Sequence, residues 1–391
     1  MKIKEMSDVL NGYAFKSSNY INDGYRIIRI TNVQSGYIED EKPVYYEYDN
    51  KLEKYDLQEN DLLISLTGNV GRCALVTRKF LPAYLNQRVC CLRVNEKIVL
   101  PKFLYYILNS KKFEFDCINS SQGIAQLNMS TEWLKKYNLE IPTIELQEKI
   151  INIFDKVYNN IDIKKNQINF CNNLIKSQFV EMFGDPKLNE KKWIKAPMGD
   201  YMTVLTDFSS NGSYKTLDST VVMYDEPQYA YMVRTTDLEN DDYKNNVKYI
   251  TKEAYNFLSK SKVYPNDIIM NKIGSAGKVY IMPDVGMPVS LGRNAFLFRY
   301  NDDIVPLFIY YLLKSEYGTN EISQYVRGAV TKTITKDDVR KVKIIVPPIE
   351  LQNKFASIVE QIDKQKFVNA NLLQLLGKNL KRCYNNIIDF R

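Results

Sequence analysis

Histidine is absent from this 391-residue sequence. Without an imidazole, the chain cannot use histidine as a general acid or base, cannot form a Ser-His or Cys-His nucleophile pair, and lacks a ligand of most zinc sites. The sequence also lacks an apolar run of the roughly 18 residues that a membrane span requires. Its N-terminus lacks the apolar region of a signal peptide. We therefore expect a cytoplasmic protein with no membrane contact.

Cysteine is scarce and the charge is nearly balanced. The six cysteines show neither CxxC pairs nor the spacing of a disulfide framework, which predicts reduced and mostly buried thiols. Basic residues outnumber acidic ones by only 53 to 46, and the resulting net charge of +7 permits nucleic-acid binding without requiring it. The length predicts two or three domains, and a hydrophobic content of 45% is sufficient for packed cores.

Catalytic signatures are missing as well. The sequence contains no glycine loop typical of S-adenosylmethionine sites, no Asn/Asp-Pro-Pro-Tyr/Phe motif and no clustered nuclease carboxylates. Asp61 and Asp267 each precede an apolar strand, where a turn explains them more simply than a metal site does. The sequence therefore predicts no catalytic residue and no metal site.

The segment from Gly274 to Lys278 looks superficially like a phosphate-binding loop. That motif requires four residues between its glycines and a Ser or Thr after the lysine, but Val279 follows here. Two interpretations remain open for the segment. It is a plain hairpin turn, or a turn whose amides and basic side chain approach a DNA phosphate.

A long helix is predicted over the stretch between Pro142 and Gly184, which contains no other proline or glycine. Apolar side chains recur in it every seven residues, which is typical of a coiled-coil seam. At about 1.5 Å per residue, such a helix would be about 55–60 Å long. A second helix is predicted near the C-terminus, and we expect the two to pair. The expected interface residues are Ile150, Phe154, Val157, Ile161, Ile168, Ile175, Met182, Phe355, Val359, Ile362, Leu373, Leu376 and Leu380.

The two helices open with the same motif, P-x-I-E-L-Q. Pro142 and Gln147 recur 205 positions later as Pro347 and Gln352. Offsets of 205 or 206 also relate a strand–glycine loop–strand segment, a helix that opens with proline, and several tyrosines. Such a regular offset predicts a tandem repeat of mixed α+β units, each followed by a long helix. The expected domains are 1–143, 144–184, 185–348 and 349–391.

The two copies differ mainly in hydrogen-bonding side chains. Residues 65–67 of the first copy are Ser-Leu-Thr, and the corresponding residues 271–273 of the second copy are Asn-Lys-Ile. Gln87-Arg88 of the first copy corresponds to Arg293-Asn294 of the second. A constant scaffold with changed polar side chains is the pattern expected of two reading heads for different DNA sequences.

This organisation resembles the specificity subunits of type I restriction-modification systems over essentially the whole chain. The motifs that carry the resemblance are residues 12–17, the paired glycine loops at 68–71 and 274–277, both helix openings and residues 178–185. No single motif is specific to this family, but the order of the motifs and their repetition are.

The resemblance implies two target-recognition domains and an antiparallel coiled coil with pseudo-twofold symmetry. Each domain would read one half of a bipartite site in double-stranded DNA, and the helices would set the spacer. Two adenine-methyltransferase subunits would dock on the chain, with or without restriction subunits. S-adenosylmethionine, and ATP with Mg²⁺ if restriction subunits join, are expected on those partners, and no cofactor is expected on this chain.

Two other functions stay open: a self-sufficient DNA methyltransferase or nuclease with an unrecognised active site, and a coiled-coil adaptor that binds protein.

The candidate DNA contacts are polar and basic residues in or near the loops that differ between the two copies. The candidates in the first copy are Thr67, Asn69, Arg72, Gln87, Arg88, Gln122, Gln126 and Asn128. In the second they are Asn271, Lys272, Ser275, Lys278, Arg293, Asn294, Arg327, Thr331 and Lys332.

Overall fold

The computed structural model describes residues 1–121 and 127–388, and the chain divides into two compact units. Unit 1 comprises Met1–Asn166 and Ala370–Arg391, and unit 2 comprises Gln167–Asn369. Each unit therefore contains one globular portion together with a segment of both long helices.

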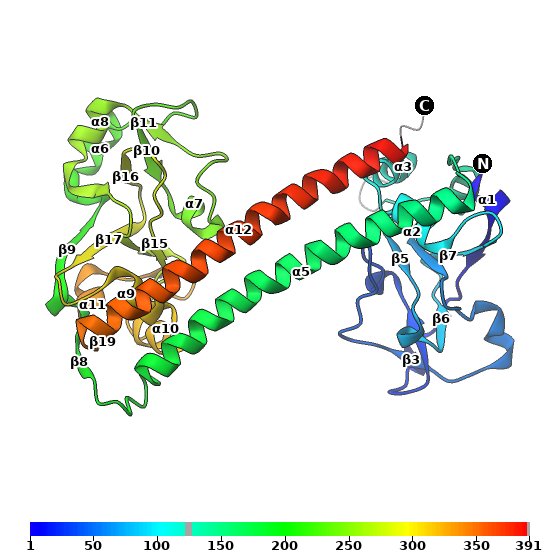
Figure 1. Ribbon diagram of the computed structural model, residues 1–391, viewed down its shortest axis with the longest axis horizontal. Helices are drawn as coiled ribbons and strands as arrows, with labels where there is room; N and C mark the ends of the chain where they lie inside the picture. Colours follow the sequence, from blue (N-terminus) through cyan, green and yellow to red (C-terminus); the bar gives the residue numbers. More distant parts are fainter. Residues whose placement is uncertain (122–126, 389–391) are drawn as a thin grey trace. The chain divides into compact units, whose positions relative to one another are not determined.

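Unit 1 is built on two sheets. The larger is antiparallel with strand order β1-β7-β4-β5, and the smaller has the order β3-β2-β6 with β2 parallel to β6 (Figure 1). The elements are α1 (Ile3–Met6), β1 (Ser7–Asn11), β2 (Tyr25–Ile28), β3 (Tyr45–Tyr46), β4 (Leu62–Ser65), β5 (Cys73–Leu75), β6 (Ala83–Leu85), β7 (Val89–Val94), α2 (Pro101–Leu108), α3 (Lys111–Ser120), α4 (Thr131–Lys136) and α5 (Ile144–Phe183).

Unit 2 repeats this plan with sheets of order β15-β13-β17-β9 and β11-β10-β16-β12, and adds two short ribbons, β14-β18 and β19-β8. Its elements are β8 (Ile194–Pro197), β9 (Met202–Asp207), α6 (Tyr214–Thr220), β10 (Ala230–Val233), α7 (Thr235–Asn240), β11 (Tyr249–Ile250), α8 (Lys252–Phe257), β12 (Lys262–Val263), β13 (Ile268–Asn271), β14 (Ile273–Gly274), β15 (Val279–Ile281), β16 (Val289–Leu291), β17 (Ala295–Tyr300), α9 (Pro306–Lys314), α10 (Glu316–Ser323), β18 (Lys332–Thr333), α11 (Lys336–Lys341), β19 (Lys343–Val346) and α12 (Ile349–Ile388).

The strand registers of the two units coincide. Leu62 lies opposite Leu92 in unit 1, and Ile268 lies opposite Phe298 in unit 2, with each residue 206 positions after its counterpart. The parallel pairs β2–β6 and β10–β16 match in the same way. The internal repeat predicted from the sequence is confirmed at the level of individual strand pairs.

One buried ion pair is duplicated with the sheets. The guanidinium of Arg93 donates from Nε and Nη2 to the two carboxylate oxygens of Asp61 at 2.9 and 2.7 Å. Arg299 makes the same pair of bonds to Asp267, both at 2.7 Å. Backbone amides add to both carboxylates, so that these aspartates are held as buried structural acceptors. The prediction that they belong to turns rather than to a metal site is consistent with this geometry.

The glutamine of each P-x-I-E-L-Q motif fixes its helix to the preceding globular portion. Both Gln147 and Gln352 are 0% exposed. The Gln352 carboxamide accepts from Val305 N at 2.9 Å and donates to the carbonyls of Asp303 and Pro347 at 2.9 and 2.8 Å. Gln147 makes the equivalent three bonds in unit 1. The motif is therefore explained by a hydrogen-bonded junction in each unit.

The long helices pair at both ends in opposite directions. In unit 1, the early part of α5 meets the late part of α12, where the Tyr158 and Tyr384 hydroxyls are 2.9 Å apart. In unit 2, the late part of α5 meets the early part of α12, and Phe179 and Phe183 contact Phe355 with ring centroids 5.5 and 5.4 Å apart. These contacts are those of an antiparallel pair. Every predicted interface position is buried or half-buried.

The heptad pattern did not predict the burial of two aromatic residues of α5. Phe179 is 4% and Phe183 is 0% exposed, and both rings pack against Phe308 of α9 as well as the paired helix. These two residues are buried by the hydrophobic core of unit 2, and they do not belong to the apolar seam with seven-residue spacing. Tertiary packing of this kind is invisible to a periodicity argument.

The remaining expectations concern cysteines and membrane segments. The six cysteines are unpaired, and five of them are buried, as predicted. Within residues 1–121 and 127–388, no helix has the length and apolarity to cross a membrane.

We predict that Gln352→Ala lowers the free energy of unfolding of unit 2 by about 2–4 kcal/mol, because it leaves one backbone amide and two backbone carbonyls of a partly buried junction without their partner. Urea unfolding can be followed by the fluorescence of Trp193 in a Trp133→Phe background, so that the signal reports unit 2. The matched control is Gln361→Ala, which removes an exposed glutamine from the same helix. Equal unfolding midpoints for the two variants would contradict the proposed junction.

Candidate nucleic-acid interface

Three segments of unit 1 meet beside the end of β4. They are the glycine loop at 66–72, the turn at 86–88 and the segment at 127–129, which we call the unit 1 cluster. Leu66 N donates to Arg88 O at 3.1 Å, and Met129 N donates to Leu66 O at 2.8 Å. Gly68 N adds a bond to Leu127 O at 2.9 Å. The three segments are thus joined through main-chain atoms.

Unit 2 assembles the same three segments at 272–278, 292–294 and 327–334, the unit 2 cluster. Lys272 N donates to Asn294 O at 2.8 Å, and Ile334 N donates to Lys272 O at 3.1 Å. Strands β14 and β18 lie within this cluster and pair antiparallel. Because the joining atoms belong to the backbone, side chains at the surface can change without loss of the cluster.

Glycine is required at one position of each loop. Gly71 and Gly277 adopt φ values of +79° and +89°, which disfavour other residues. A Cβ at these positions would also lie 2.7 Å from Cys117 or Ile322. Both loops therefore form tight turns, a geometry that both interpretations of the segment from Gly274 to Lys278 share.

The structure brings together the unit 1 candidates that it describes. Arg72 donates to the side chain of Gln34, a partner that local spacing did not indicate. Gln122 and Gln126 lie outside the described residues. Asn69, Gln87, Arg88 and Asn128 are exposed, and Thr67 and Arg72 are half-buried.

In unit 2, one candidate is placed where it cannot contact a ligand directly. Asn271 is 0% exposed, and its amide donates to Glu239 at 2.9 Å and to the Tyr280 hydroxyl at 3.3 Å. Its position corresponds to Ser65, which is also buried. The expectation for Asn271 is therefore wrong: it lies in a central strand that is covered on both faces. Lys278, Arg293, Asn294, Arg327, Thr331 and Lys332 are exposed, and Lys272 and Ser275 are half-buried.

Lys272 is part of an ion triad. Its ammonium lies 2.8 Å from one carboxylate oxygen of Asp207, and that of Lys336 lies 2.9 Å from the other. Burial alone would raise the pKa of Asp207, but hydrogen bonds from Lys272, Ser210 and Lys336 outweigh this effect and lower the pKa to about 2. The triad joins the glycine loop to β9 and α11, and local spacing does not indicate it, because Lys272 and Lys336 lie 65 and 129 positions from Asp207.

Two lysines of the unit 2 cluster, by contrast, carry free charge. The side chains of Lys278 and Lys332 have no hydrogen bond or ion pair with any residue in the described part of the chain. Arg327 is only loosely held: its side chain is 73% exposed and reaches Asp338 at 3.1 Å. Exposed cations beside backbone amides are suited to bind phosphate oxygens.

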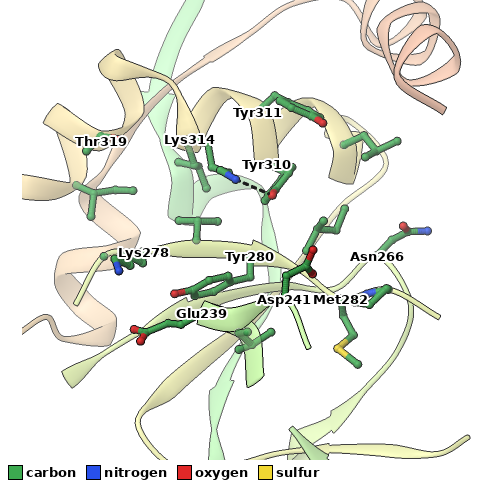
Figure 2. Close-up of a pocket in the computed structure, with 18 of the residues that line it drawn as sticks. Glu239, Asp241, Asn266, Lys278, Tyr280, Met282, Tyr310, Tyr311, Lys314 and Thr319 are labelled. Atoms are coloured by element: carbon green, nitrogen blue, oxygen red, sulfur yellow. Dashed lines mark hydrogen bonds between the residues drawn. The ribbon is translucent and has the colours of Figure 1, made fainter. Parts of the chain in front are cut away.

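A cavity of about 1400 Å³ lies beside Lys278 in unit 2. Figure 2 shows Glu239 and Tyr280 on one side of it and Tyr310, Tyr311 and Lys314 on the other, with Lys314 donating to the Tyr310 hydroxyl at 3.0 Å. In unit 1 the loop around Gly36 occupies the corresponding place. Gly36 N donates to Cys73 O at 2.9 Å, and Tyr105, the counterpart of Tyr310, donates to Gly36 O at 2.7 Å. The two units thus differ in shape as well as in side chains.

Comparisons with known proteins agree with this geometry. The profile described as the type I restriction modification DNA specificity domain matches residues 1–170 and 205–376. The EcoBI specificity subunit of Escherichia coli is 24% identical over 99% of this chain and 83% of its own length. The putative MjaX specificity subunit of Methanocaldococcus jannaschii is 25% identical over 99% of this chain and 92% of its own length.

Solved structures show the same fold. The S subunit of a type I restriction-modification system from M. genitalium aligns with a TM-score of 0.61 and 15% identity, over 100% of this chain and 96% of that one. A chain solved in a study of complex assembly and conformational transition of the type I R-M system aligns with a TM-score of 0.58 and 15% identity, over 99% and 96%.

Two repeated α+β units with matching polar clusters and paired long helices define a tandem recognition protein. The chain belongs to the type I restriction-modification DNA specificity family. It is a specificity subunit, a non-catalytic component that directs a restriction-modification system to DNA. The resemblance drawn from the sequence is confirmed, and neither the self-sufficient enzyme nor the adaptor is supported by these matches.

The lowered pKa of Asp207 generates a prediction about acid stability. Because the folded pKa is below the ordinary value of about 3.9, the triad contributes fully above about pH 4 and its contribution is lost as the pH falls toward 2. The wild type should exceed Asp207→Asn in free energy of unfolding by up to about 2 kcal/mol above pH 4. This difference should shrink between pH 4 and 2.

Urea unfolding at a series of pH values measures the difference. The control is Asp225→Asn, which removes an aspartate that is 79% exposed and pairs with Lys248; its effect should be small throughout. A difference for Asp207→Asn that stays constant from pH 5 to 2 would show that the triad does not titrate as described.

Proposed function

We propose that each unit reads one half of a bipartite site in double-stranded DNA through its three-segment cluster. The observation that carries this proposal is the repetition of one backbone arrangement with different exposed side chains in the two copies. A protein that reads two different half-sites needs a common geometry for docking and different hydrogen-bonding groups for base edges. The long helices would then set the separation between the half-sites.

The candidate residues divide into two roles in this proposal. Cationic side chains that are free, or only loosely paired as in Arg327, bind phosphates, and neutral amides and hydroxyls contact base edges. Lys272 keeps a supporting role, because its charge is already paired, and Arg72 is similarly tied to Gln34. The Thr67 hydroxyl oxygen is buried, which removes this residue from the candidate base contacts. The proposed phosphate contacts are Arg88, Lys278, Arg327 and Lys332, and the proposed base contacts are Asn69, Gln87, Gln122, Gln126, Asn128, Ser275, Asn294 and Thr331, with Arg293 discussed below.

The catalytic partners are also part of the proposal. Two methyltransferase subunits would dock on this chain and carry S-adenosylmethionine, and restriction subunits with ATP and Mg²⁺ would join in a restriction-competent complex. The support is that relatives are named as specificity subunits of type I restriction enzymes. In this proposal the target-recognition domains are residues 1–143 and 185–348, and the long helices are residues 144–184 and 349–391.

A binding selection tests the function directly. The chain is purified with its methyltransferase subunits and offered duplexes of random sequence at physiological salt. Two short preferred sequences separated by a fixed gap of indifferent bases are expected. A single continuous preferred sequence, or no preference, would refute the two-head proposal.

We predict that Lys278→Ala and Lys332→Ala weaken binding to all sequences about equally, because a phosphate contact carries no base information. Each variant should also reduce the slope of log K against log salt concentration by about 0.9. Fluorescence anisotropy titrations at several salt concentrations measure both effects. Lys187→Ala, which removes an exposed lysine from the loop after α5, is the control and should change neither quantity. A changed base preference would assign these lysines to base reading instead.

The helices generate a separate prediction. Deleting residues 163–169 from α5 together with 368–374 from α12 removes one heptad from each, which preserves the phase of the apolar seam. At about 1.5 Å per residue the pair shortens by about 10 Å, and the permitted gap between half-sites should shrink by roughly two or three base pairs. The same binding selection measures the gap. If the gap stays constant while both half-sites are retained, the helices do not set the spacer.

A further inference from the structure

Unit 2 contains an insertion beside its cluster that unit 1 lacks. Asn11 and Asp207 occupy the same register position in their sheets, and so do Arg26 and Tyr231. These positions are 15 residues apart in unit 1 and 24 apart in unit 2, so unit 2 has nine additional residues. They include the short helix α6.

The insertion supplies a clamp for the guanidinium of Arg293. On α6, Asp218 accepts a hydrogen bond from Arg293 Nη2, and the Tyr214 hydroxyl accepts one from Nη1 at 3.3 Å. The guanidinium carbon also lies 5.2 and 5.3 Å from the ring centroids of Tyr214 and Phe208. Carboxylate, hydroxyl and two rings therefore hold a side chain that is still 40% exposed. Gln87, its counterpart in unit 1, has no comparable partner among the described residues.

The clamped arginine forms one edge of a small pocket. The pocket has a volume of about 250 Å³, and its apolar lining residues are Phe208, Val221, Met223 and Met232. Arg234, Thr235, Thr236, Gly292, Arg293 and Asn294 complete the lining. In unit 1 the segment at Tyr13 fills the corresponding space: Tyr13 N donates to Leu85 O and Gln87 N donates to Tyr13 O, at 2.9 and 3.0 Å. In unit 2 the held guanidinium of Arg293 thus lies beside a partly apolar pocket, whereas in unit 1 the segment at Tyr13 fills the corresponding space.

The charge of this site favours a base over a phosphate as its ligand. The ion pair with Asp218 offsets the positive charge of Arg293, so that the pair offers little net attraction to the DNA backbone. Orientation is retained, because a planar guanidinium has five N–H donors and Asp218 and Tyr214 engage only part of them. Lys278 and Lys332, with unpaired ammonium groups, are better suited to phosphates. A fixed fork of donors matches the O6 and N7 acceptors of guanine in the major groove.

We propose that Arg293 reads a guanine in the half-site bound by unit 2, and that Asp218 and Tyr214 are its positioning residues. This proposal rests on the proposed function. It assigns a role to the nine-residue insertion: the insertion pre-orients one specificity-determining side chain, and the neighbouring pocket accommodates the apolar edge of an adjacent base.

The test uses the complete chain with its methyltransferase subunits in the binding selection described above. Asp218→Ala removes the main positioning group, and Arg293→Lys keeps the charge but loses the planar fork. Both variants should lower the preference for guanine at one position of one half-site by roughly 10-fold or more. The slope of log K against log salt concentration should stay unchanged for Arg293→Lys. Asp225→Ala, which breaks the ion pair with Lys248 in the same unit, is the matched control and should alter no position.

The half-site read by unit 1 serves as an internal measure of folding, since it should be retained by every variant. If the wild type selects no bipartite site, the proposed function itself fails. If the wild type selects a bipartite site but Asp218→Ala and Arg293→Lys weaken all sequences equally, Arg293 is a phosphate contact and the inference alone is overturned. The inference is also overturned if the position that loses its preference is not a guanine.

Discussion

The buried carboxamides of Gln147 and Gln352 hold each long helix to the globular portion that precedes it. Each carboxamide binds one backbone amide and two backbone carbonyls at a junction that water does not reach. Since its partners are main-chain atoms, the junction is independent of the side chains that differ between the copies. A recognition unit can therefore change its exposed residues while the helix that leaves it keeps its direction, which is the constraint a molecular ruler must satisfy.

The same logic applies inside each cluster. Main-chain hydrogen bonds join the glycine loop, the turn and the third segment, and Gly71 or Gly277 permits the tight approach to the neighbouring helix. The duplicated arginine–aspartate pair stabilises the sheet beneath. The exposed side chains of the two clusters can then differ, as reading two different DNA sequences would require. Buried main-chain contacts hold the fold, and in the proposed mode of DNA reading the exposed side chains determine the specificity.

Much of this architecture could be predicted from local spacing in the sequence. The reason is that equivalent contacts occur in both units, at a constant offset in residue number. The heptad seam of α5, the glycines of the tight turns and the proline that opens α2 follow from period and turn chemistry. Asn271 was misjudged, because a central strand covered on both faces shows no alternation that would reveal its burial. The pairs Lys272–Asp207 and Arg293–Asp218 were missed, because their members lie 65 and 75 positions apart and only the tertiary fold joins them.

The two units also differ in their ion pairs, a difference that comparison of the two sequence copies does not reveal by itself. Unit 2 supports its glycine loop with an ion triad whose counterparts in unit 1 are neutral: Asn11, Leu66 and Thr131. Placing a lysine alone at position 66 would leave a half-buried cation without its carboxylate, because the rest of the triad is missing there. Placing a glutamine at 293 would also leave Asp218 without its partner, at a smaller cost because Asp218 is 42% exposed. The proposed recognition residues are therefore paired with supporting residues far away in sequence. If they read DNA as proposed, exchange of a whole unit would change the specificity with fewer broken ion pairs than single substitutions would.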